Sequence, residues 1–156
     1  MFESCENLVI RHCCTKQIFG LASLKGSLKV LDVDGSVSSL SALFDLGDLD
    51  IDETPPWAAL SRLNITNATI ENIDDAVKVF PNLENLNLHG NCLKNTQNLD
   101  NLLRLTILDL SQNSLGKGYK ILVSVVHIVR YCRICRQMTL NRQANNLFFQ
   151  GLSSMN

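Results

Sequence analysis

Residues 83–93 read Leu-Glu-Asn-Leu-Asn-Leu-His-Gly-Asn-Cys-Leu, and residues 105–115 repeat the pattern as Leu-Thr-Ile-Leu-Asp-Leu-Ser-Gln-Asn-Ser-Leu. A looser copy, Leu-Ser-Arg-Leu-Asn-Ile-Thr-Asn-Ala-Thr-Ile, occupies residues 60–70. The alternating apolar positions predict a short strand with one buried face. Asn91 and Asn113 stand where a turn follows the strand, and their side chains are suited to satisfy backbone groups that would otherwise be buried unpaired.

This spacing is that of the leucine-rich repeat. The three copies begin 23 and 22 residues apart, and two weaker units start earlier, at Cys5 and Leu28. The pattern predicts about five units in residues 1–115. We expect a right-handed α/β solenoid with a parallel sheet on its concave side and irregular or helical segments on its convex side. The predicted core includes the leucines that face inward: Leu8, Leu31, Leu63, Leu86, Leu88, Leu108 and Leu110.

The second unit is longer than the others, because 32 residues separate Leu28 from Leu60. The excess falls in residues 45–56, which are rich in aspartate and end in two prolines. This composition predicts an extended loop on the convex side or at the edge of the array. Trp57 follows the loop directly, and we expect it to pack at the start of the third unit.

The charge of the chain is unevenly distributed. Residues 1–115 carry 8 basic and 15 acidic side chains, whereas residues 116–156 carry 6 basic and none that are acidic. Two interpretations of this tail stay open. It is either a degenerate sixth unit that caps the array, aligned through Val129, Cys132, Ile134 and Gln137, or a truncated or alternative end of a longer array. Its apolar run, residues 121–129, is shorter than the roughly 20 residues that a membrane span requires.

The chain lacks the usual sequence signatures of an enzyme. It has no nucleophile elbow, no phosphate-binding glycine loop and no HExxH motif, and its three histidines are not grouped with carboxylates in sequence. Cys132 and Cys135 form a CxxC pair without the further ligands that a zinc site needs. We therefore predict a non-enzymatic protein with no catalytic residues, no cofactor and no metal site. The first residues, Met-Phe-Glu-Ser-Cys, show neither the basic region nor the apolar region of a secretory signal. A cytoplasmic location with reduced cysteines is therefore expected.

Stacked units would align the outward strand residues into three columns across the concave face. The first column contains Asn7, Val30, Arg62, Asn85 and Ile107; the second contains Val9, Asp32, Asn64, Asn87 and Asp109; the third contains Arg11, Asp34, Thr66, His89 and Ser111. This face is polar and mildly acidic, which suits a protein partner and disfavours nucleic acid. The predicted contact residues are Val30, Asp32, Asp34, Arg62, Asn64, Asn85, Asn87, His89, Ile107 and Asp109.

The order of features in residues 5–115 adds a family resemblance. A weak repeat is followed by an acidic insertion, the sequence Pro56-Trp57 and regular repeats that begin after Phe80-Pro81. This order resembles the amino-terminal repeats of the family of the serine/threonine-protein kinase eleven-interacting protein, and nischarin is a looser relative. The resemblance implies a cytoplasmic scaffold that tethers a signalling kinase such as liver kinase B. It also implies an indirect association with endosomal or lysosomal membranes, through parts of longer relatives that this chain lacks.

Three other functions stay open on the sequence alone. The 22-residue spacing also suits a regulatory subunit of a phosphatase. Two glycosylation sequons, at Asn64 and Asn67, would fit an extracellular recognition protein. The array could also act as a spacer fragment of a longer scaffold. The identity of the partner and the oligomeric state are not encoded in any motif of this chain.

Overall fold

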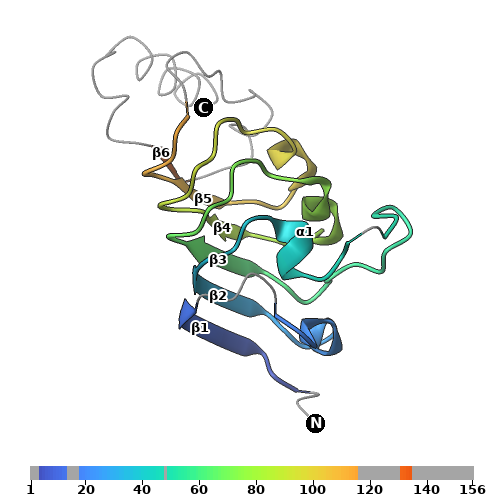
Figure 1. Ribbon diagram of the computed structural model, residues 1–156. Helices are drawn as coiled ribbons and strands as arrows, with labels where there is room; N and C mark the ends of the chain where they lie inside the picture. The colour runs from blue at the N-terminus through green and yellow to red at the C-terminus, as the bar shows by residue number, and fades with distance from the viewer. Residues whose placement is uncertain (1–3, 14–17, 48, 116–130, 135–156) are drawn as a thin grey trace.

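The computed structural model of the chain describes residues 4–13, 18–47, 49–115 and 131–134, and these residues form one open parallel sheet with short helices opposite it (Figure 1). The sheet strands lie side by side in sequence order, and every neighbouring pair is parallel. The predicted parallel sheet is therefore confirmed. The strands are β1 (Asn7–Cys13), β2 (Val30–Gly35), β3 (Arg62–Thr66), β4 (Asn85–Asn87), β5 (Ile107–Leu110) and β6 (Tyr131–Ile134).

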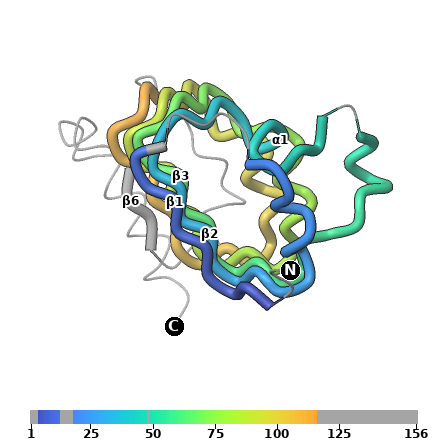
Figure 2. The backbone as a smooth tube through the Cα atoms, turned by 60° about the horizontal axis from the view of Figure 1, so that its bottom comes forward, coloured from blue at the N-terminus to red at the C-terminus, as the bar shows by residue number. Residues whose placement is uncertain are grey.

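Short helices lie in the segments that lead from one strand to the next. They are η1 (Leu21–Leu24), α1 (Leu40–Leu43), η2 (Asp75–Val79) and η3 (Leu99–Asn101), where η marks a 3-10 helix. Each strand and the segment that follows it make one unit, and successive units overlie one another in Figure 2. The parallel strands require such return segments, because every strand must begin at the same edge of the sheet.

The core lies between the sheet and the return segments. Six of the seven predicted core leucines are almost completely buried, from Leu31 to Leu110. Leu8 differs, because it is only partly buried and packs against the margin of the core. The prediction overestimated the burial of Leu8, because β1 is the first strand of the sheet and pairs with β2 alone among the described strands.

A residue with a positive φ angle lies at or near the end of each of the first five strands. The φ angles are 55° at His12, 138° at Gly35, 51° at Asn67, 69° at Gly90 and 55° at Gln112. Glycine and asparagine adopt this conformation most readily, whereas other side chains strain the backbone there. At Gly90 space is limiting as well, because an added β-carbon would lie 2.6 Å from Oδ1 of Asn67. The chain therefore turns away from the sheet at the same position in each unit.

Two asparagines bond the turns of adjacent units together. The Asn91 amide donates to the carbonyls of Ile65 (2.8 Å) and Leu88 (3.0 Å), and its Oδ1 accepts from the Ile70 N–H (3.1 Å). Asn113 repeats this arrangement one unit later, with bonds to Leu88, Leu93 and Leu110. Both asparagines satisfy backbone groups, as predicted from the repeat pattern.

The acidic insertion is a loop that contains several turns. Turns occur at Asp45, at Gly47 and over residues 51–53, and Thr54 donates its hydroxyl to the Asp50 carbonyl at 2.7 Å. Leu46 is buried and Ile51 packs against the core, so the insertion is anchored to the body of the protein. Residues 45–47 and 49–56 contain no helix or strand, in keeping with the predicted loop. The insertion projects away from the stacked units on the side opposite the strands (Figures 1 and 2).

An aromatic cluster closes the base of the insertion. The Trp57 ring meets Phe44 edge to face with ring centroids 4.8 Å apart, and Phe44 lies 4.7 Å from Phe80. The backbone N–H of Trp57 also donates to the Val79 carbonyl at 2.7 Å. All three rings are buried. Trp57 thus packs where the third unit begins, and it joins that unit to the second.

Strand β6 extends the sheet beyond the regular repeats. It pairs with β5 so that Leu108 lies opposite Cys132 and Leu110 opposite Ile134. This register matches the alignment of a degenerate sixth unit. Val129, Cys135 and Gln137 lie outside the described residues, and the nature of residues 116–156 as a whole stays a prediction.

Candidate protein-binding face

The outward residues of the strands form one continuous surface, here called the outer sheet face. The pairing places Asn7, Val30, Arg62, Asn85 and Ile107 in one row, and Val9, Asp32, Asn64, Asn87 and Asp109 in the next. A third row runs from Arg11 through Asp34 to Thr66 over the first three strands. These rows are the predicted columns. Strict alternation along a strand explains them, since a residue between two buried leucines must point to the other face.

The apolar side chains on this face differ in how much they expose. Ile107 is 39 % exposed and Val9 is 54 % exposed, whereas Val30 is half-buried between its neighbours. Arg62 is exposed, and the other predicted contact residues are half-buried. Val30 was expected to be an exposed contact centre, and the structure shows that Val9 and Ile107 offer more apolar surface.

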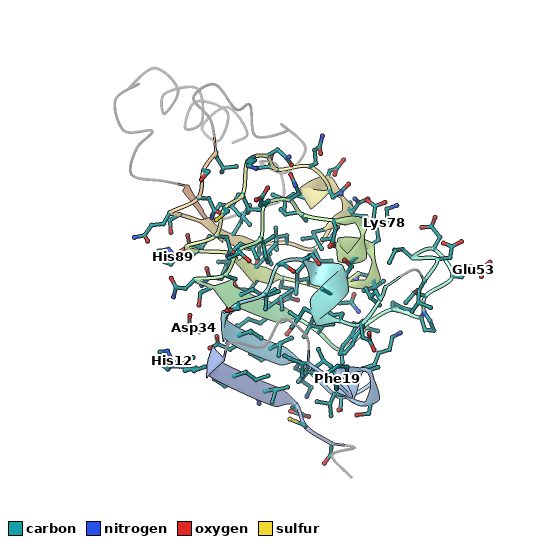
Figure 3. The ribbon with its side chains drawn as sticks, in the orientation of Figure 1. His12, Phe19, Asp34, Glu53, Lys78 and His89 are labelled. Atoms are coloured by element: carbon teal, nitrogen blue, oxygen red, sulfur yellow. The ribbon has the colours of Figure 1, made fainter. Side chains whose placement is uncertain are left out.

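A shallow hollow of about 320 Å³ lies over the first four strands. The predicted residues Asp32, Asp34, Asn64 and Asn87 line it, and three further residues complete it: Arg11, His12 and Thr66. The Arg11 guanidinium lies 3.7 Å from the Asp32 carboxylate, and Nδ1 of His12 lies 3.7 Å from that of Asp34. Figure 3 shows His12, Asp34 and His89 along the strand side of the molecule. Polar groups therefore line the hollow, and its volume is at the lower end for ligand sites.

His12 was not predicted to take part in this surface. Its signal in the sequence is positional, because it follows the third-column residue Arg11 and takes the left-handed conformation at the end of β1. Arg11 and Thr66 were placed in the columns but not among the contact residues. Column position alone could have identified both.

Besides Asp32, which pairs with Arg11, the other two predicted contact carboxylates accept hydrogen bonds within the chain. Asp34 accepts a hydrogen bond from the Asn67 amide at 2.9 Å, and Asp109 accepts one from the Ser111 N–H at 2.9 Å. Asn87 repeats the second arrangement, since its Oδ1 accepts from the His89 N–H at 3.0 Å. These side chains stabilise the ends of their strands, so a change at any of them would alter the turn as well as the face.

His89, Ser111 and Asp109 form a chain of hydrogen bonds. A ring nitrogen of His89 lies 2.7 Å from the Ser111 hydroxyl, and that hydroxyl donates to the Asp109 carboxylate. In a serine-hydrolase triad the carboxylate holds the histidine, and the histidine accepts the proton of the serine. Here the carboxylate receives the serine proton directly. The arrangement fixes the orientation of His89 on the outer sheet face and does not activate Ser111.

Other predicted contact residues present unengaged polar groups. Within the part of the chain that the structure describes, no hydrogen bond or ion pair joins the side chains of Arg62, Asn64 or Asn85 to another residue. They stand next to one another on β3 and β4. Together with Ile107, which lies in the same row as Arg62 and Asn85, they form the part of the face that is free to contact a partner without first breaking an internal bond.

The comparison with known protein families gave no match to any family model. None of the helices in the described ranges has the length or the apolar character that crossing a lipid bilayer requires.

Proposed function

We propose that the chain is a leucine-rich-repeat solenoid that binds a protein partner through its outer sheet face and performs no chemistry itself. The observation that carries the proposal is the alignment of polar side chains into rows over five strands, above a core of leucines. Repeat arrays use such surfaces for recognition, because many strands present side chains at fixed spacing. The short helices and turns opposite the sheet suit the convex side of this repeat class.

The chemistry of the face favours a partner with hydrogen-bonding and basic groups. Half-buried carboxylates lie on β2 and half-buried amides on β3 and β4, and exposed apolar residues stand at the two ends of the face, at Val9 and Ile107. Protein interfaces combine such polar rims with a few apolar contacts. The family resemblance names a candidate, liver kinase B. The same resemblance places the proposed scaffold in the cytoplasm, near endosomal or lysosomal membranes through a longer protein.

Binding of purified liver kinase B to the immobilised full chain tests both parts of the proposal. The test variant combines Asn64→Lys with Ile107→Ser, because neither side chain takes part in a described internal hydrogen bond and a lysine on this face repels a basic partner. The matched control combines Gln97→Lys with Leu103→Ser, which changes an exposed glutamine and a 70 % exposed leucine outside the sheet. We expect the test variant to weaken binding by about tenfold or more and the control to leave it unchanged.

The experiment tests the binding surface and the identity of the partner separately. Equal binding by the unaltered chain, the test variant and the control would contradict the outer sheet face as the binding surface. No binding of the kinase to the unaltered chain would remove liver kinase B as the partner. Urea unfolding of all three proteins is the check on folding, since each changed side chain is at the surface.

A further inference from the structure

A second hollow lies on the other side of the molecule, between η1 and the acidic insertion. Its volume is about 340 Å³, and its lining includes Ala22 and Lys25 from the first unit and Leu49, Glu53 and Trp57 from the second and third units. Figure 3 shows Glu53 on the projecting insertion, away from His12, Asp34 and His89 of the outer sheet face. This hollow, here called the insertion groove, exists because the second unit is longer than the others.

The floor and one wall of the insertion groove are apolar. Phe44, Leu46 and Trp57 form the floor from the buried aromatic cluster and its neighbour, and Leu49 stands in the wall. Leu49 is 58 % exposed, although Leu46, on the same segment, is buried. An exposed aliphatic side chain beside an apolar floor gains from contact with another apolar group.

The rim of the insertion groove is predominantly acidic. Asp45, Asp50 and Glu53 line it, and Lys25 is the one cation among the described lining residues. Over the same described residues no ion pair joins Lys25 to Asp50 or to Glu53, and the nearby Asp52 is the residue that pairs with Lys78, at 4.0 Å. Burial lowers the pKa of the Lys25 ammonium group from its ordinary value. Among the described residues, the Asp50 and Glu53 carboxylates are thus not paired with Lys25.

We propose that the insertion groove is a second docking surface, which takes a short basic segment of a partner protein that inserts one aliphatic or aromatic side chain against Leu49 and the aromatic floor. Charge complementarity selects this occupant. A cationic segment meets the Asp50 and Glu53 carboxylates and a single lysine, whereas an acidic segment or a nucleic acid would meet net repulsion. The volume of the groove suits one or two large side chains rather than a folded element.

The groove and the outer sheet face lie on different sides of the chain. A scaffold with both surfaces could hold two partners at once, or hold one partner at two points with a gain from effective concentration. The proposal does not depend on the function assigned to the outer sheet face, because no lining residue of the groove belongs to that face.

The test uses the full chain and three synthetic peptides of equal length. The first peptide contains several lysines and arginines around a leucine and a phenylalanine; the second replaces both apolar residues by serine; the third replaces the basic residues by glutamate. Trp57 is the single tryptophan of the chain and lines the groove, so its fluorescence reports occupancy directly. Anisotropy of the labelled peptides gives the affinity independently.

Two variants separate the groove from the rest of the surface. Leu49→Ser removes the exposed apolar contact, and Glu53→Lys reverses a rim charge whose side chain makes no described internal contact. Leu103→Ser and Glu84→Lys are the matched controls, since they make the same changes at exposed positions outside the groove. We expect the first peptide to bind with a change in Trp57 emission, and each groove variant to weaken it by about tenfold. We expect the two control variants to bind the first peptide as tightly as the unaltered chain does. We expect the serine and glutamate peptides to bind the unaltered chain weakly and without a change in Trp57 emission.

Three results would overturn the proposal. The first is an absence of binding by the basic apolar peptide. The second is an equal loss of binding in groove and control variants, which would indicate nonspecific attraction between charges. The third is a groove already filled by the basic tail of the chain or by a second copy. In that case Trp57 emission would change in Glu53→Lys, or on dilution, without any peptide.

Discussion

The junction between β3 and β4 and the junction between β2 and β3 hold adjacent units together by different means. At the first, a single buried side chain, Asn91, bonds to backbone groups of both units. At the second, the corresponding turn has Ala68, and the contacts are an Asn67–Asp34 hydrogen bond and a backbone bond from Thr69 to Val37, both 2.9 Å long. The aromatic cluster below the insertion joins these two units as well.

The comparison shows that different residues set the strand register and satisfy the backbone groups of the turns. Buried apolar residues occupy the same two inward positions of the strand on both sides of each junction, and the parallel pairing is in register at both. The polar partner in the turn is interchangeable, provided that the backbone groups find some acceptor or donor. At the junction between the second and third units, the packing of Trp57 against Phe44 supplies a contact between units where the turn has Ala68 and no asparagine. Four substitutions test this division between core, turn and face.

Trp57→Ala should have the largest effect. It removes the ring that packs edge to face against Phe44 at the junction between the second and third units, and loss of a buried tryptophan typically costs about 3–5 kcal/mol. The free energy of unfolding, from urea titration followed by circular dichroism, is the measurement. Phe19→Ala is the matched control, because Phe19 is 83 % exposed and its removal should change stability by less than about 0.5 kcal/mol. Equal effects of the two substitutions would contradict the role given to the aromatic cluster.

Asn91→Ala should destabilise the protein by roughly 2–3 kcal/mol, since it leaves a buried N–H and two buried carbonyls without their partner. The same unfolding experiment measures this. Asn64→Ala is the control on the outer sheet face, where no described hydrogen bond is lost. If the two asparagines proved equivalent, the turn at Asn91 would not depend on its side chain, and the contrast between the junctions would disappear.

Gly90→Ala should cost roughly 1–2 kcal/mol, because the alanine must adopt a left-handed backbone conformation. Its β-carbon would also displace the Asn67 side chain and with it the bond to Asp34. Gly26→Ala serves as the comparison, since no atom lies within 4 Å of a β-carbon added there. Matching midpoints of urea unfolding for the two variants would argue against a restrictive turn after β4.

The sequence predicted the strands and the columns because both follow from one spacing rule. Leu86 and Leu88 must share a face when they are two residues apart, and each column then follows by counting. Leu8 is partly exposed because β1 has a described neighbouring strand on one side only. The repeat pattern within one unit does not show which strand lies at the edge of the sheet. The contacts of Asp34 and Asp109 depend on turn geometry at residues further along the chain. The insertion groove was not predicted at all, since it requires η1 and residues 45–56 to meet across a long sequence separation.

Leu86→Ala compared with Asn85→Ala tests the central claim most directly, that neighbouring residues of one strand belong to the core and to the outer sheet face. Leu86 is buried among the leucines of adjacent strands, and Asn85 lies in the outward row beside Arg62 and Ile107. The account predicts a loss of about 2–5 kcal/mol in the free energy of unfolding for Leu86→Ala and less than about 0.5 kcal/mol for Asn85→Ala. Comparable losses, or a larger loss for Asn85→Ala, would contradict the register on which the proposed binding face depends.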